Sequence, residues 1–199
     1  MSLFFSYDIL VYSKTWDEHL LHLDIVLHTL MENQLYVNHS KYLIARNEME
    51  YLGHVINVTG VAVDAAKIQS METWPTPTTT IALRGFLGLT DYYRKFIKNY
   101  STIAAPLTQL LRKDGFHWSK TAEKAFLTLK QAMIQAPVLA LSDFAKQFMV
   151  ESYASGTGLG SILMQDGRPI AYYSKALSGW ALVRSTYEKE LMAIILSVH

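Results

Sequence analysis

The sequence contains no cysteine, which excludes disulfide bonds and thiolate metal sites and leaves the redox compartment open. It also lacks a signal peptide and any apolar run of about 18 residues, so nothing in it favours membrane insertion. We find no internal repeat and no low-complexity tract in the 199 residues, half of which are hydrophobic. We therefore expect an intracellular protein of one or two domains, with real cores, no targeting signal and no membrane partner.

The net charge of +1 conceals an uneven distribution of charged side chains. Residues 1–64 carry 3 basic and 8 acidic side chains, whereas residues 84–130 carry 9 basic and 3 acidic ones. The segments 65–83 and 131–199 are balanced. A nearly neutral chain with one basic segment predicts a local surface for a polyanion.

The basic segment coincides with an amphipathic stretch, residues 78–113. Pro75 and Pro77 break the chain before it, and the threonines that follow supply helix N-caps. Apolar positions recur with a spacing near 3.6 at Phe86, Leu87, Thr90, Tyr93 and Ile97. The opposite stripe of the same expected helix consists of Arg84, Gly88, Asp91, Lys95 and Lys98.

Pro106 is expected to start a second helix, which ends at Arg112 and Lys113, where the helix dipole favours cations. Glycine at position 88 would permit close approach of a ligand to the basic stripe. The same periodicity is typical of an ordinary helix pair with a solvated face. Periodicity alone therefore does not establish a binding surface.

Turn and capping signals predict mixed strands and helices in the rest of the chain. The expected strands cover residues 4–12 with a polar step at 6–8, and then 35–37, 42–45, 51–56, 138–141, 148–152, 161–165 and 170–174. The expected helices are residues 15–33, which begin at a Thr15–Glu18 capping box, a short segment capped by Asp64, and residues 121–135. A last helix starts at a Ser185–Glu188 capping box and runs to His199. Asp166–Gly167 is a hairpin turn signal, and Gly156, Gly158 and Gly160 are assigned to a loop. We interpret His19, His22 and His28 as solvated helix residues rather than metal ligands.

Several blocks of the sequence are similar to one known family, in the order that the family has them. FLGLTDYYRKFIKNY followed by PLTQLL resembles the thumb region of reverse transcriptases from gypsy-type long-terminal-repeat retrotransposons. The further blocks with such a resemblance are YDILVYSKTWDEHLLHL, EYLGHVI, APVLALSDF, GRPIAYYSKALS and YEKELMAI. Together they cover essentially the whole chain.

This resemblance implies an α+β fold that begins at the end of a polymerase palm. It implies the C-terminal part of the palm over residues 1–64, a helical thumb over 65–113, a connector over 114–146 and an incomplete ribonuclease H-like α/β domain over 147–199. The family activities are RNA-directed DNA synthesis and hydrolysis of RNA in RNA–DNA hybrids. Both depend on carboxylates that hold Mg²⁺, since hard cations bind anionic oxygen.

The catalytic carboxylates implied by the resemblance are mostly missing. Asp8 matches the second aspartate of a polymerase pair, but Tyr7 replaces the first, and a neutral phenol is a poor magnesium ligand. Tyr153 likewise stands at the position of the first ribonuclease H aspartate, and Glu190 matches the second acidic ligand. Asp8 and Glu190 are therefore remnants of incomplete metal sites, and we expect neither activity and no productive binding of Mg²⁺. From the residues alone, Asp8 is interpreted as a hairpin turn residue.

Gly53 and His54 lie in a segment that resembles the one holding the primer end, although a plain half-buried strand explains the same residues. With Arg84, Gly88, Lys95, Lys98, Arg112 and Lys113 they form the expected nucleic-acid contacts. These residues predict weak, non-specific binding of RNA–DNA hybrid or duplex. Three alternatives stay open: such a binding module, a module that packs against a polymerase subunit, and a decayed reading frame without function. The sequence departs from the family at residues 179–184 and at Tyr42.

Overall fold

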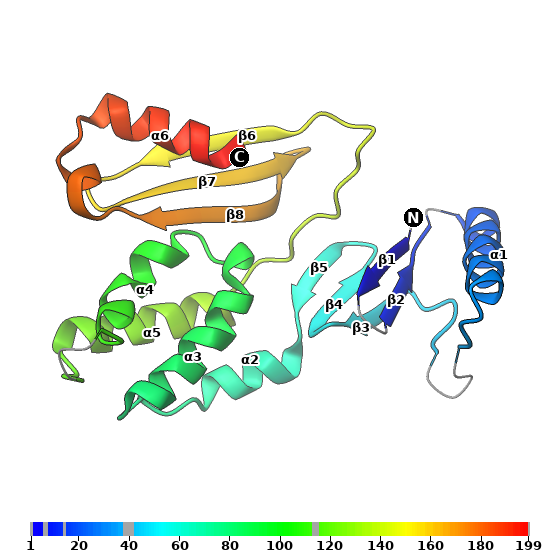
Figure 1. The fold of residues 1–199 in the computed structure, drawn as a ribbon, viewed down its shortest axis with the longest axis horizontal. Coiled ribbons are helices and arrows are strands. Elements are labelled where there is room, and N and C mark those ends of the chain that lie inside the picture. Colours follow the sequence, from blue (N-terminus) through cyan, green and yellow to red (C-terminus); the bar gives the residue numbers. More distant parts are fainter. Residues whose placement is uncertain (1, 6–7, 14, 38–41, 113–115, 199) are drawn as a thin grey trace. The chain divides into compact units, whose positions relative to one another are not determined.

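The computed structural model describes residues 2–5, 8–13, 15–37, 42–112 and 116–198. The chain divides into two compact units, Met1–Asn47 and Glu48–His199 (Figure 1). Both units combine helices with antiparallel strands, which confirms the expected mixture of the two.

The first unit consists of a strand pair and a helix. β1 (Ser2–Phe5) pairs with β2 (Asp8–Val11), with Phe5 opposite Asp8, and α1 covers Trp16–Glu32. As predicted, Thr15 caps α1: its side chain accepts a hydrogen bond from the Glu18 N–H at 3.3 Å. His22 and His19 lie on α1 with Nδ1 atoms 2.7 and 3.4 Å from the Ser13 hydroxyl oxygen.

The strands expected at residues 35–37 and 42–45 are wrong. Both segments lack regular structure, and their apolar side chains, such as Leu35 and Leu43, are exposed. Strand propensity is a preference for a pleated, half-buried surface, so it forms no strand where no neighbouring strand offers pairing.

The second unit begins with a three-stranded antiparallel sheet. The strands lie in the order β3 (Glu48–Tyr51), β4 (His54–Asn57) and β5 (Gly60–Val63). Leu52 and Gly53 form the turn between β3 and β4 with φ angles of 49° and 73°. The single strand expected over 51–56 is therefore wrong, because a two-residue turn with two positive φ angles reverses the chain there.

A helix cluster follows, called the helix cluster α2–α5 below. It comprises α2 (Ala65–Glu72), α3 (Thr80–Tyr92), the 3₁₀ turn η1 (Arg94–Phe96), α4 (Tyr100–Gln109) and α5 (Lys120–Ile134). Side-chain caps start three of these helices: Asp64 accepts from the Ala66 N–H, Thr79 from the Ala82 N–H and Ser119 from the Ala122 N–H. The predicted cap at Asp64 is thus confirmed.

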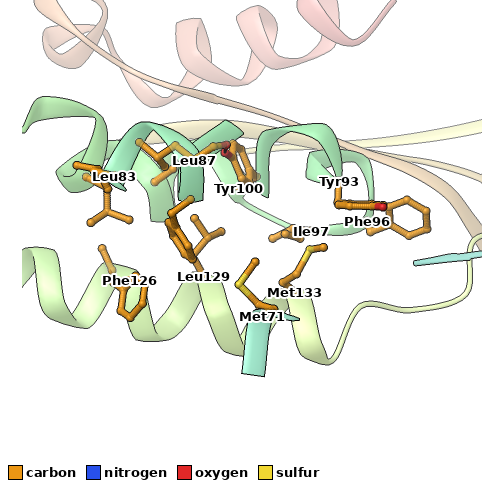
Figure 2. Close-up of a cluster of buried hydrophobic side chains, with 14 of the residues drawn as sticks. Met71, Leu83, Leu87, Tyr93, Phe96, Ile97, Tyr100, Phe126, Leu129 and Met133 are labelled. Atoms are coloured by element: carbon orange, nitrogen blue, oxygen red, sulfur yellow. Dashed lines mark hydrogen bonds between the residues drawn. The ribbon is translucent and has the colours of Figure 1, made fainter. Parts of the chain in front are cut away.

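The apolar faces of these helices meet in one core (Figure 2). Fully buried members come from α2, α3, α4 and α5: Met71, Leu83, Phe86, Leu107, Leu129 and Met133. Burying each such side chain contributes about 1.5–3 kcal/mol. The core therefore fixes the relative positions of α2, α3, α4 and α5.

The continuous helix expected from Leu83 to Lys98 is wrong. α3 ends at Tyr92, η1 makes one tight turn, and Asn99 adopts a left-handed conformation (φ 61°) before α4. Tyr93, Phe96, Ile97 and Tyr100 are all buried at helical spacing, so the apolar pattern looks the same with or without the break. Pro106 does not start a helix; it lies inside α4, which begins six residues earlier.

The C-terminal part is a second three-stranded antiparallel sheet, called the C-terminal sheet below, with one helix on it. The strands are β6 (Met149–Ala154), β7 (Gly158–Gln165) and β8 (Arg168–Ala176), in that order. The hairpin turn predicted at Asp166–Gly167 is confirmed, with φ angles of 51° and 73°. Gly158 and Gly160 lie within β7, so their assignment to a loop is wrong.

The segment 138–141 is also not a strand. Leu139 makes a single antiparallel bridge to Val61 of β5, with two backbone hydrogen bonds of 2.8 Å. One bridge is enough to satisfy both backbone groups of the buried Leu139.

The 3₁₀ turn η2 (Gly179–Val183) leads into α6 (Thr186–Val198), which packs on β6 and β7. The Ser185–Glu188 capping box is confirmed: each residue's backbone N–H donates to the other's side-chain oxygen. The helix turns Ala193 toward the sheet and leaves an apolar row exposed at Leu191, Ile194, Ile195 and Val198. In Figure 1, α6 lies on one face of this sheet and α4 lies beside β8 on the other.

Candidate nucleic-acid interface

Two adjacent tyrosines at the end of α3 hold the tip of the β3–β4 hairpin. The Tyr92 hydroxyl donates to the Leu52 carbonyl, and the Tyr93 hydroxyl donates to the Gly53 carbonyl, both at 2.6 Å. A Cβ at Gly53 would lie 2.8 Å from the Tyr93 hydroxyl oxygen, so glycine is required by close approach as well as by its φ of 73°. The hairpin tip is therefore fixed to α3 at two points.

His54, the residue after the turn, is enclosed by aromatic rings. Its ring stacks on Tyr92 (centroids 5.4 Å apart) and lies 5.3 Å from Tyr93 and 5.5 Å from Phe96. Its Nδ1 is buried and has no hydrogen-bond partner among the described residues. Burial, and secondly the charge of Lys95, lower the pKa of His54 to about 4. His54 is thus a neutral packing residue at neutral pH and not a cationic phosphate ligand.

Lys95 is a cation close enough to this hairpin for its charge to act on His54. Its side chain is exposed, and Nζ lies 5.3 Å from the centre of the Phe96 ring. Desolvation by the surrounding side chains lowers its pKa. Its neighbour Arg94 makes an exposed ion pair with Asp91 at 3.6 Å, which offsets part of its charge.

The other expected contact residues do not lie on one helical stripe. Arg84 and Gly88 are exposed on α3, and a Cβ at Gly88 would meet no atom within 4 Å. Lys98 lies beyond η1, and Arg112 is exposed three residues after α4 ends. Lys113 lies outside the described residues. The structure therefore brings Gly53, His54 and Lys95 together. Arg84 and Gly88 share α3, whereas Lys98 and Arg112 lie in two other segments.

Three residues with clear roles escaped the sequence analysis. Helical periodicity predicts Tyr93 as a core residue and assigns no role to Tyr92, because a repeat of apolar positions does not show what a hydroxyl group contacts. Lys130, counted with the basic segment, donates instead to the Trp74 carbonyl at 3.1 Å and is half-buried. The adjacent YY pair at a helix end, opposite a glycine-containing strand segment, was the available signal.

Replacing Tyr93 by phenylalanine is expected to lower the free energy of unfolding by about 1 kcal/mol, since one hydrogen bond in a half-buried place is lost. Chemical denaturation followed by tryptophan fluorescence measures this change. Tyr92→Phe is the matched control: the Tyr92 ring is 53% exposed, so water can replace its hydroxyl. Equal losses of unfolding free energy in the two variants would show that the Tyr93 hydrogen bond stabilises the fold no more than the exposed Tyr92 bond does.

Tyr153 and Glu190, which match the ribonuclease H ligands, lie in different surroundings. The Tyr153 hydroxyl donates to Asn99 Oδ1 at 2.9 Å, and burial, followed by the neighbouring Tyr172, raises its pKa. Glu190 is exposed on α6. Strand alternation turns Ala154 toward α6, and therefore turns Tyr153 toward the opposite face of the sheet.

The donor set does not fit a magnesium site. Asp8 is exposed at the start of β2 in the first unit, and Tyr7 lies outside the described residues. Within the described part of the chain, no three His, Cys, Asp or Glu side chains gather closely enough to hold a metal ion. A neutral phenol at position 153 adds no anionic oxygen. The described residues therefore offer no cluster of anionic oxygens for Mg²⁺.

Among the described helices, none is long and apolar enough to cross a membrane.

Residues 118–199 match a family described as an RNase H-like domain found in reverse transcriptase. The chain is 37% identical over 190 residues to the retrovirus-related Pol polyprotein from transposon 297 of Drosophila melanogaster, covering 94% of this chain and 18% of that protein. It is 33% identical over 201 residues to the Pol polyprotein from transposon gypsy of the same species, covering 94% of this chain and 19% of that protein. The chain thus spans less than a fifth of the length of these two relatives.

Solved structures give a similar result. The structure is similar to a foamy viral protease-reverse transcriptase in complex with an RNA/DNA hybrid, with a TM-score of 0.84 and 26% identity. The similarity covers 96% of this chain and 27% of that one.

Proposed function

Because the chain belongs to the retrovirus-related Pol polyproteins of gypsy-type retrotransposons, within their reverse transcriptase and RNase H-like region, we propose that it is a non-catalytic module that binds duplex nucleic acid. The proposed division places the palm end in residues 1–64, the thumb in 65–113, the connector in 114–146 and a ribonuclease H-like part in 147–199. The ligand is an RNA–DNA hybrid or another duplex, held weakly and without sequence preference.

The observation that carries this proposal is the hairpin tip fixed to α3 next to Lys95. Two tyrosine hydroxyls and the ring of His54 hold Leu52 and Gly53 in place before any ligand arrives. Preorganisation lowers the cost of binding, and the exposed Lys95 supplies charge for a phosphate. The similar foamy viral enzymes were solved with an RNA/DNA hybrid and with double-stranded DNA, which supports this ligand class.

Backbone binding of this kind should depend strongly on salt. If Arg84, Lys95 and Lys98 neutralise three phosphates, affinity for a labelled hybrid should fall roughly 20- to 60-fold between about 50 and 200 mM salt. Fluorescence anisotropy measures this dependence. Changing all three residues to glutamine should flatten it, because each side chain is exposed and its loss leaves the core intact.

A charge-matched control replaces Lys67, Lys120 and Lys124, which are exposed on α2 and α5. This control should retain the salt dependence of the wild-type protein. Identical salt dependence in both triple variants would mean that Arg84, Lys95 and Lys98 face solvent and do not contact the nucleic acid.

We also propose that this chain has lost both family activities. Tyr153 engages Asn99 and contributes a neutral phenol, and Glu190 and Asp8 are the carboxylates that remain of the expected sets. Primer extension and digestion of a labelled hybrid, each with magnesium or manganese, should give no turnover. Metal-dependent cleavage that disappears in Glu190→Gln would overturn the nuclease half of this proposal.

A protein-binding role is the second candidate, and one feature favours it. The apolar row Leu191, Ile194, Ile195 and Val198 is 48–78% exposed along α6. Contiguous exposed apolar faces are typical of interaction surfaces. A polymerase subunit as the partner has no support from the described contacts.

A further inference from the structure

The C-terminal sheet is joined to the helix cluster α2–α5 by polar contacts at the start of α4. The Ser101 N–H donates to Ser174 Oγ at 2.9 Å, and the Ser101 hydroxyl donates to the Ser174 carbonyl at 2.7 Å. A Cβ at Gly158 would lie 2.2 Å from the Thr102 hydroxyl oxygen. The sheet therefore approaches α4 so closely that hydrogen bonds, rather than a thick apolar layer, define this interface.

Tyr153 adds a side chain that spans the interface. Its hydroxyl reaches Asn99 Oδ1 at 2.9 Å, and Lys98 Nζ lies 5.3 Å from the centre of its ring. The ring lies across β7, where a Cβ at Gly160 would come within 2.4 Å of it. The Tyr153 ring can occupy this position because Gly160 has no side chain.

Asn99 is suited to receive this contact. It precedes α4 with a left-handed φ of 61°, a conformation that asparagine tolerates well. An asparagine at this position commonly caps its helix, yet here the side chain makes no capping bond. Its oxygen accepts from Tyr153 instead.

We propose that Tyr153, Asn99 and Lys98 form a latch that fixes the C-terminal sheet to the start of α4. A residue at a position where the resemblance implies a metal ligand serves here to join two parts of the fold. An aspartate carboxylate would be too short to reach Asn99 from the same backbone, so the latch depends on tyrosine. This role requires no nucleic acid, although Lys98 also belongs to the proposed set of phosphate contacts.

Hydrogen exchange at the Ser101 amide tests the latch directly, because that N–H donates across the interface. Tyr153→Phe keeps the ring over Gly160 and removes the bond to Asn99, so exchange at Ser101 should become about fivefold faster. Tyr187→Phe is the control, since Tyr187 is 86% exposed on α6. Unchanged exchange at Ser101 in Tyr153→Phe would overturn the proposal.

A double-mutant cycle distinguishes a specific contact between Tyr153 and Asn99 from a general loss of stability. Asn99→Gly deletes the amide and still permits the positive φ. If the latch exists, Tyr153→Phe should accelerate exchange at Ser101 in the wild-type background and have little further effect in Asn99→Gly. Equal acceleration by Tyr153→Phe in both backgrounds would show that the two side chains do not act together.

Discussion

Acidification from about pH 7 to pH 4 is expected to destabilise the wild-type protein by about 2 kcal/mol more than the His54→Phe variant. The pKa of His54 is lowered from 6.5 to about 4 in the folded state. Between pH 6.5 and about pH 4, His54 is protonated in the unfolded chain and neutral in the folded chain. The contribution of neutral His54 is therefore complete above pH 6.5 and is lost as the pH falls toward 4.

Phenylalanine is the informative replacement for His54. It can keep the ring contacts with Tyr92, Tyr93 and Phe96, and it removes both the titrating group and the unpaired buried Nδ1. Denaturant unfolding at a series of pH values gives the two curves, and their difference isolates His54 from the carboxylates. The control His117→Phe changes an exposed histidine and should follow the wild-type curve. Parallel curves for wild type and His54→Phe would contradict the burial argument.

This pH dependence would reach the proposed binding surface through the hairpin. A proton on His54 would place a charge among Tyr92, Tyr93 and Phe96 and beside Lys95, where like charges repel. The hairpin tip should then separate from the end of α3. Weaker binding of a hybrid at low pH is thus expected to accompany the loss of stability.

Local signals in the sequence predicted the elements that local chemistry controls. The Ser185–Glu188 capping box, the cap at Asp64 and the Asp166–Gly167 turn each involve residues within three positions of one another. Such contacts depend on few other parts of the chain, so their residue types are sufficient evidence. The family and the mixed fold were likewise accessible, because whole blocks of sequence carried the resemblance.

The candidate site was less accessible because its geometry comes from distant contacts. Tyr93 and Gly53 are 40 residues apart, and Tyr153 and Asn99 are 54 apart. The break after Tyr92 separates Arg84 from Lys95 and Lys98, and helical periodicity continues through that break. Charge counting also overstated the basic surface, since Lys130 is engaged with the Trp74 carbonyl.

Substituting Gly60 by alanine is expected to cost about 3 kcal/mol or more, from two backbone hydrogen bonds and an unfavourable backbone conformation. Gly60 begins β5 with a φ of 142°, and a Cβ there would lie 1.9 Å from the Leu139 carbonyl oxygen. The two 2.8 Å bonds between Val61 and Leu139 could not persist at that separation. Leu139, which is 2% exposed, would then leave the core, and the segment before β6 would lose its attachment to β5.

Gly88→Ala is the matched control, and it also tests the proposed interface. Gly88 lies in α3 with open space around its Cβ position, so alanine should raise the free energy of unfolding by about 0.5–1 kcal/mol. Chemical denaturation of both variants measures the contrast, and a stable Gly60→Ala protein would contradict the contact with Leu139. If a nucleic-acid backbone approaches α3 at Gly88, the more stable Gly88→Ala protein should bind a hybrid more weakly than wild type. Unchanged affinity would place the bound duplex away from this turn of α3 and leave the fixed hairpin tip and Lys95 as the contact region.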